Sequence, residues 1–167
     1  MRSKRAILFV GVICAIVLFG WWLHLSLLDG LIGSGLARVV GEDTIYAAAY
    51  SEHRFRQVRN GMDQKHVFEL LGPPLKQSWV YGSANSDPLI ITAAPDGRIQ
   101  YVSGPATPTT QRIVKGMRLE DVRSVIGQPA KVVWAYSTSA HDSSYRIRAI
   151  IFRNNAVSET RHEYYWD

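Results

Sequence analysis

The feature that most constrains the fold is an internal repeat with a constant offset of 55 residues. Residues 57–82 align without a gap against residues 112–137, and eight of the 26 positions are identical. The identical pairs are Gly61/Gly116, Met62/Met117, Val67/Val122, Gly72/Gly127, Pro74/Pro129, Lys76/Lys131, Trp79/Trp134 and Tyr81/Tyr136. A unit of about 50 residues buries too little apolar surface alone, so we expect one pseudo-symmetric unit and not two independent domains.

In each copy the sequence predicts a helix near the start of the aligned residues, 57–82 and 112–137. Asp63 can accept a hydrogen bond from a free backbone N–H of the first turn, whereas the second copy places Glu120 and Asp121 at the positive helix end. Gly72 and Gly127 suit the left-handed residue that ends a helix, and the proline that follows prevents its continuation. We therefore read these glycines and prolines as structural punctuation and not as a ligand loop.

A shorter first helix is expected upstream, capped by Ser51 and carrying Phe55 and Val58. After the longer helix of each copy the apolar period changes to two, which is typical of strands. Strands are predicted at 75–81, 89–92 and 99–102 in the first copy and at 132–136, 146–153 and 157–165 in the second. Each copy thus reads helix, helix, strand, strand, strand, an α+β pattern.

A second feature is the uncharged apolar run over residues 6–28. At 1.5 Å per residue it would form a helix of roughly 35 Å, so it predicts a transmembrane helix. Three cations, Arg2, Lys4 and Arg5, precede it, and the positive-inside rule then puts the N-terminus in the cytoplasm. We expect an uncleaved anchor because no A-x-A-like cleavage site follows. Bulky Ile13, before Cys14, does not fit a lipoprotein signal.

The expected organisation has six parts and a single-pass location in the inner (cytoplasmic) membrane, with the C-terminal domain periplasmic. The parts are a cytoplasmic tail at 1–5, a transmembrane helix at 6–28, a juxtamembrane linker at 29–50, a first repeat at 51–103, a linker at 104–110 and a second repeat at 111–167.

Composition narrows the function classes. Without the three cations before the apolar run, the chain has 16 basic and 14 acidic residues. The basic residues are scattered along the sequence, so no nucleic-acid partner is expected. The only cysteine, Cys14, lies in the apolar run, which leaves no disulfide or thiolate metal site in the rest of the chain. The five histidines form no metal-ligand spacing, and we predict no metal and no cofactor. His24 as an axial haem ligand is a weaker alternative to a place in an interfacial aromatic belt.

Two further patterns invite catalytic or cofactor readings. The string His141-Asp142-Ser143-Ser144 contains the letters of a catalytic triad, but adjacency in sequence is irrelevant to triad geometry, so a polar hairpin loop is expected. The glycines of Gly30-x-x-Gly33-x-Gly35 do not follow a strand, which argues against a dinucleotide site and favours a flexible linker. We predict no catalytic residues, with an enzyme built on His141 and Asp142 as the weakest alternative.

The chain resembles a known family at the motif Phe55-x-x-Val58-x-x-Gly61-Met62, at Leu71-Gly72-x-Pro74, at the aromatic strand with Trp79 and Tyr81, and at the Asp96-Gly97-x-Ile99 hairpin. These residues are similar to the SmpA/OmlA or BamE-like family of small envelope proteins. The resemblance implies, for each repeat, two short helices packed on a three-stranded antiparallel sheet. The tandem arrangement also resembles β-lactamase inhibitor protein, in which two such repeats form a concave surface. The resemblance covers about residues 51–103 and 108–166.

The leading functional hypothesis is a membrane-anchored protein–protein interaction module, an accessory or assembly subunit of an envelope complex, and not an enzyme. Its expected partners are a protein in the membrane or periplasm and, through residues 6–28, the lipid bilayer. An enzyme inhibitor or ligand-sensing domain that uses the concave sheet is the alternative. Because Tyr and Trp are favoured in binding hot spots, the candidate binding residues are aromatic: Trp79, Tyr81, Trp134, Tyr136, Tyr164, Tyr165 and Trp166.

Overall fold

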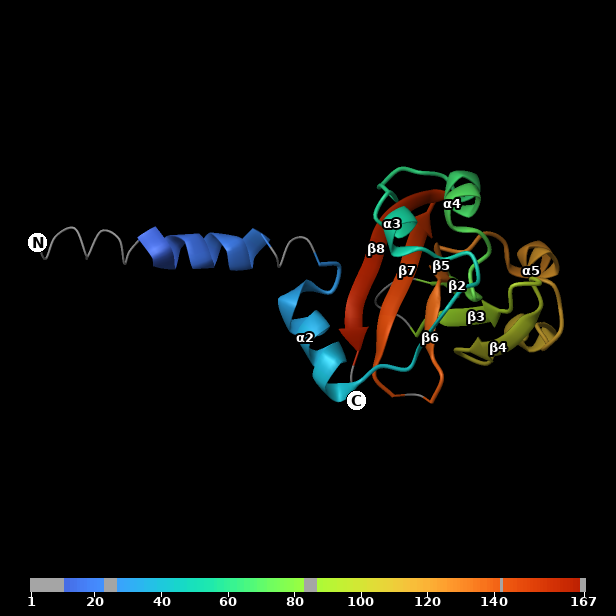
Figure 1. The fold of residues 1–167 in the computed structure, drawn as a ribbon. Helices are drawn as coiled ribbons and strands as arrows, with labels where there is room; N and C mark the ends of the chain where they lie inside the picture. The colour runs from blue at the N-terminus through green and yellow to red at the C-terminus, as the bar shows by residue number, and fades with distance from the viewer. Residues whose placement is uncertain (1–10, 23–26, 83–86, 142, 166–167) are drawn as a thin grey trace, which may run out of the picture.

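The fold is α+β and was obtained as a computed structural model that describes residues 11–22, 27–82, 87–141 and 143–165 (Figure 1). Beyond a helical segment at 11–22, the helices are α2 (Gly30–Val40), α3 (Glu52–Phe55), α4 (Gln64–Leu71), the 3₁₀ helix η1 (Thr110–Arg112) and α5 (Leu119–Ile126). The strands are β1 (Thr44–Tyr46), β2 (Lys76–Tyr81), β3 (Leu89–Ala93), β4 (Ile99–Ser103), β5 (Lys131–Ala135), β6 (Ser137–Ser139), β7 (Tyr145–Arg153) and β8 (Ala156–Tyr165).

The two repeats share one antiparallel sheet. Its strand order is β4-β3-β2-β5-β7-β8, and β1 and β6 form a separate two-stranded ladder. The repeats join where β2 pairs with β5, with Trp79 opposite Val132. The six strands therefore form a single layer, and the expectation of one pseudo-symmetric unit is confirmed.

The helices of each repeat cover the strands of the other repeat. Val67 and Leu71 of α4, in the first repeat, are fully buried against β5, β7 and β8 of the second. Val122 of α5, in the second repeat, is fully buried against β3 and β4 of the first. The two apolar cores are therefore built reciprocally, and neither repeat supplies both layers of its own core.

Residues that recur in both copies form contacts that cross between them. Gly61 and Met62 exchange backbone hydrogen bonds with Val157 of β8 at 2.8 and 2.7 Å. In the matching contact, Gly116 and Met117 exchange two bonds of 2.8 Å with Ile99 of β4. Each Gly-Met pair thus extends the outer strand of the opposite repeat, a role that sequence reasoning did not assign to it.

The recurring tyrosines follow the same rule. The Tyr81 hydroxyl donates to the carbonyl of Gly127 at 3.3 Å, and the Tyr136 hydroxyl donates to the carbonyl of Gly72 at 3.2 Å. The tyrosine of each repeat therefore donates a hydrogen bond to the carbonyl at the helix end of the other repeat, where intrahelical partners are lacking.

Most predicted elements lie within a few residues of their expected positions. Of the two predicted side-chain helix caps, one is confirmed and one is wrong. Asp63 accepts a bond from His66 N–H at 2.7 Å, as predicted, whereas Ser51 makes no side-chain cap bond. Gly72 and Gly127 have positive φ, which confirms that part of the prediction. Their ψ values of −167° and −155° place them in a region that is open essentially to glycine alone, and not in the left-handed helical region.

The predicted transmembrane helix over residues 6–28 is wrong. No helix formed by the described residues is both long enough and apolar enough to cross a bilayer. Within the predicted span, residues 11–22 are helical, and at 1.5 Å per residue this segment measures about 18 Å. Residues 6–10 and 23–26 lie outside the described residues. The single-pass topology and the inner-membrane location fail with that helix, and contact with the bilayer stays an untested expectation.

The predicted linker at 29–50 and the start of the predicted second repeat differ from their expected character. Residues 30–40, expected as part of a flexible linker, form helix α2, and residues 44–46 form strand β1. The first helix of the second repeat is only the 3₁₀ turn η1. Gly33 permits close packing, because a Cβ there would lie 3.0 Å from the Cβ of Asp29 and 3.3 Å from that of Tyr164, whereas a Cβ on Gly35 would meet nothing within 4 Å.

We expect Gly72→Ala to be more destabilising than Gly127→Ala. Both changes impose backbone strain of about 1–3 kcal/mol. At Gly72 the new Cβ would also lie 2.7 Å from the Cβ of Ala49, whereas at Gly127 it meets nothing within 4 Å. Urea unfolding of both variants measures the difference, and equal losses would show that the Ala49 contact has no energetic weight.

Reciprocal packing predicts that the two repeats fold only together. A chain divided between residues 106 and 107 should give fragments that are unfolded alone and that regain the fold when mixed. Circular dichroism with size-exclusion chromatography measures this recovery. A monomeric 1–106 fragment with its own cooperative unfolding transition would contradict the reciprocal core.

Candidate functional site

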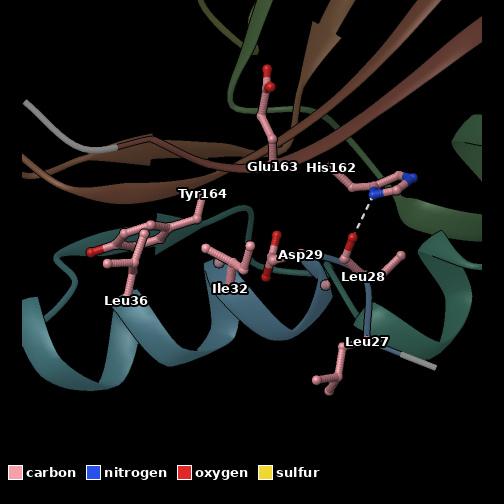
Figure 2. Close-up of a pocket in the computed structure, with 10 residues that line it drawn as sticks. Leu27, Leu28, Asp29, Ile32, Leu36, His162, Glu163 and Tyr164 are labelled. Atoms are coloured by element: carbon pink, nitrogen blue, oxygen red, sulfur yellow. Dashed lines mark hydrogen bonds between the residues drawn. The ribbon is translucent and has the colours of Figure 1, made fainter. Parts of the chain in front are cut away.

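The candidate site is a groove between α2 and the C-terminal half of β8 (Figure 2). It encloses about 520 Å³. Leu27, Ile32 and Leu36 give it an apolar lining, and His162 and Tyr164 line it from β8. Figure 2 shows the Tyr164 ring above Leu36 and the Glu163 side chain pointing the other way. Alternation along β8 explains this arrangement, because successive side chains face opposite sides of the sheet.

The groove continues along β8 past Leu27 and Leu28. A second cavity of about 310 Å³ shares these two leucines and His162 with the first, and extends to Phe55 and Val58. Together the two cavities form a depression that runs from α2 to α3. We call this depression, with its two sets of lining residues, the α2–β8 groove.

Two hydrogen bonds hold α2 and its leading turn on β8. His162 Nδ1–H donates to the Leu28 carbonyl at 2.7 Å, drawn as the dashed line in Figure 2. The Tyr164 hydroxyl donates to the Gly41 carbonyl at 2.6 Å. The helix is therefore held at both ends, and the groove between these two contacts has a defined width.

The outward side of α2 is apolar. Ile32 is 76% exposed and Val39 86% exposed, and Val40 is exposed beside them. The buried members of the helix are the small residues Gly30 and Ala37. A surface helix ordinarily presents polar residues outward, and this one presents its larger apolar side chains beside a single exposed cation, Arg38.

A buried charge network anchors the N-terminus of α2. Asp29, directly before the helix, accepts two bonds from Arg148, at 2.7 and 2.9 Å, and one of 2.7 Å from Arg146. Arg148 also binds Glu52 at 2.7 Å, and Arg146 binds Glu42 at 2.6 Å. Arg148 is fully buried, and the Asp29 side chain is 1% exposed. The two-pronged guanidinium–carboxylate geometry is the strong and directional form of this contact.

The surroundings of Arg148 keep it charged. Burial alone would lower its pKa, but hydrogen bonds to the carboxylates of Asp29 and Glu52 outweigh that effect and raise the pKa above its ordinary value. The network therefore stays intact at any pH at which the carboxylates are ionised.

The predicted aromatic residues on the central strands lie mostly in the two cores. Trp134 is 6% exposed and packs edge-on against Phe152, with 4.8 Å between ring centroids, and Tyr136 is fully buried. Trp79 and Tyr81 are half-buried against the other core. Burial raises the pKa of Tyr81 to about 12. Of these four side chains, only Trp79 and Tyr81 have surface to offer a partner.

The three C-terminal aromatic residues separate. Tyr164 lines the α2–β8 groove, and Tyr165, 43% exposed, lies on the opposite face of the sheet beside Tyr145. Trp166 lies outside the described residues. The structure thus brings one of the predicted binding residues, Tyr164, into the groove and does not bring the six described ones together.

The loop that invited a catalytic reading is held by Asp43. Ser139 Oγ and the His141 backbone N–H both donate to its carboxylate, at 2.8 Å each. Desolvation would raise the pKa of Asp43, but these bonds outweigh it and lower the pKa below its ordinary value. Asp142 lies outside the described residues. Within the described ranges, no group of three His, Cys, Asp or Glu side chains is placed to hold a metal ion.

Sequence reasoning missed Asp29, Arg146 and Arg148. A signal was present in β7, because a period of two puts both arginines on the same face as the core residues Ile150 and Phe152. Cations on a core-facing side call for buried carboxylate partners. The partner Asp29 is more than a hundred residues away in the chain, and no local pattern points to it.

The comparisons with known proteins add no relative. No protein-family model matches the chain, and no curated protein matches it significantly. The resemblance to the SmpA/OmlA family therefore stays a prediction from the motif residues.

We expect Arg148→Met to destabilise the fold by about 3–5 kcal/mol, because it leaves the buried Asp29 carboxylate without its main partner. Urea unfolding measures the loss. The matched control is Arg161→Met, which breaks an exposed 3.1 Å pair with Glu159 and should cost at most about 1 kcal/mol. Adding Asp29→Asn to Arg148→Met should restore part of the stability, since the unpaired charge is then removed. Equal losses in the two arginine variants would contradict the anchoring role.

Proposed function

We propose that the chain is a protein-interaction module, an accessory or assembly subunit that binds an apolar segment of a partner protein along α2 and the α2–β8 groove. The observation that carries the proposal is the apolar outward side of α2. Contiguous exposed apolar surface on a folded domain marks interaction sites.

The shape of the groove supports a side-chain-bearing segment as its occupant. The two cavities of about 520 and 310 Å³ lie in one line along β8 and share their leucines. Each is large enough for one or more apolar side chains, as in recognition of an amphipathic helix by a groove. Ile32 and Val39 on the rim would add apolar contact on the outer side.

The rigid support of the groove also favours binding. Because Asp29 is tied to two arginines of β7, and Tyr164 to the end of α2, the walls are positioned before a partner arrives. A preformed site avoids the entropic cost of ordering the binding surface.

Photo-crosslinking tests the proposal. A benzoylphenylalanine at position 32 of the full chain, in extract of the cells that produce it, should give a discrete adduct with a protein partner. The same group at position 114, where exposed Val114 lies away from the groove, should give none.

Substitutions on α2 test the same proposal quantitatively. Ile32→Glu combined with Val39→Glu should weaken binding of that partner at least tenfold, which corresponds to about 1.4 kcal/mol, and so lower its recovery in affinity purification. Val114→Glu adds one charge to an exposed apolar site elsewhere and should leave recovery unchanged. Recovery of the chain alone, or equal loss with Val114→Glu, would overturn the proposal.

A further inference from the structure

A second concave site lies between α4 and α5. Two adjoining cavities of about 470 and 320 Å³ share Gln64 of α4 and Arg123 of α5. Strands β2 and β5 form the base, with Trp79 on one side and Val132 on the other. We call this the interhelical cleft. It lies where the two repeats meet, and the turn at 154–155 closes one end, far from the α2–β8 groove.

The repeat itself provides an internal reference for this cleft. The offset of 55 residues makes Arg123 the counterpart of Phe68 and Trp79 the counterpart of Trp134. Phe68 packs edge-on to Trp134, with 6.4 Å between ring centroids, whereas the Arg123 guanidinium lies 5.5 Å from the centre of the Trp79 ring. A cation thus occupies the position that an aromatic residue fills in the other copy. Trp79 remains partly exposed, whereas Trp134 is buried.

The charge of Arg123 is not neutralised by a neighbour. Among the described residues no carboxylate forms an ion pair with it, whereas nearby Arg118 is paired with Glu120 at 2.6 Å. A cation held over an aromatic ring at the lip of a cleft is placed to receive an anionic group.

Besides Lys131 of β5 and the paired side chains of Arg118 and Glu120, the remaining polar side chains of the lining are carboxamides. They come from α4, β2, the end of α5 and the β7–β8 turn, and they are Gln64, Gln77, Gln128, Asn154 and Asn155. Each carboxamide offers a donor and an acceptor, which matches the N–H and C=O that each peptide group presents. Inorganic phosphate offers mainly acceptors, with at most two O–H donors near neutral pH, and so matches this mixed set of donors and acceptors less well than a peptide main chain does.

From this combination we infer that the interhelical cleft binds an extended acidic peptide. A glutamate or aspartate carboxylate binds Arg123 beside the Trp79 ring, and the carboxamides bond to the peptide main chain. This site is separate from the α2–β8 groove, and it does not depend on the function proposed for that groove.

The test is a titration of the ¹⁵N-labelled full chain with N-acetylated, C-amidated hexaglutamate. The indole N–H resonance of Trp79, assigned with Trp79→Phe, should move saturably. Hexaglutamine should bind at least tenfold more weakly, and inorganic phosphate should give no saturable shift at matched concentration. Binding of hexaglutamate should weaken as salt rises, because an exposed ion pair is screened.

Three variants decide whether Arg123 is responsible. Arg123→Gln should weaken hexaglutamate binding at least tenfold, and Arg123→Phe, which recreates the arrangement of the other repeat, should do the same in a stably folded chain. The matched control Arg112→Gln removes one exposed cation outside the cleft and should change binding less than twofold. The inference is overturned if Arg112→Gln weakens binding equally, if hexaglutamine binds as tightly, or if phosphate produces the same saturable shift.

Discussion

The structure depends on one constraint: the longer helix of each repeat packs on the strands of the other repeat and not on its own. Val67 and Leu71 of the first repeat are buried on strands of the second, and Val122 of the second is buried on strands of the first. Burial of apolar side chains is the dominant favourable contribution to folding. Because that contribution is realised only across the repeat boundary, the continuous sheet, the Gly-Met edge contacts and the tyrosine–carbonyl bonds all follow from it.

The pseudo-symmetry has been broken at the two places where binding surface appears. In the interhelical cleft, Arg123 lies where the other copy has Phe68, and Trp79 beside Arg123 stays partly exposed whereas Trp134 beside Phe68 is buried. At the far end of β8, α2 is an element with no counterpart in the repeat, and it creates the groove together with His162 and Tyr164. The residues that the two copies share stabilise the fold, and the residues that differ between the copies form the candidate binding surfaces.

The repeat allowed the strands, the longer helices and their glycine ends to be predicted from sequence. The exchange of helices could not be predicted, because Val67 and Val122 present the same pattern to either sheet and the sequence contains nothing that distinguishes them. The α2 helix was missed because its glycines read as a linker, and its packing depends on the distant Tyr164. The period of two in β7 places Arg148 on the core-facing side, which indicates a buried carboxylate partner. Only the tertiary structure identifies that partner as Asp29. The apolar segment before residue 29 led to a transmembrane prediction that the helical length of the described residues contradicts.

The short connection at residues 104–110 has a consequence for how such a molecule is assembled. Two separate copies of a single repeat would have to find each other in solution, and their association would depend on protein concentration. Joining them covalently makes the encounter intramolecular, with an effective local concentration of millimolar order for a short linker. The shared core therefore persists at any dilution, and a recombination event that removed one copy would leave the survivor without the other half of its interior.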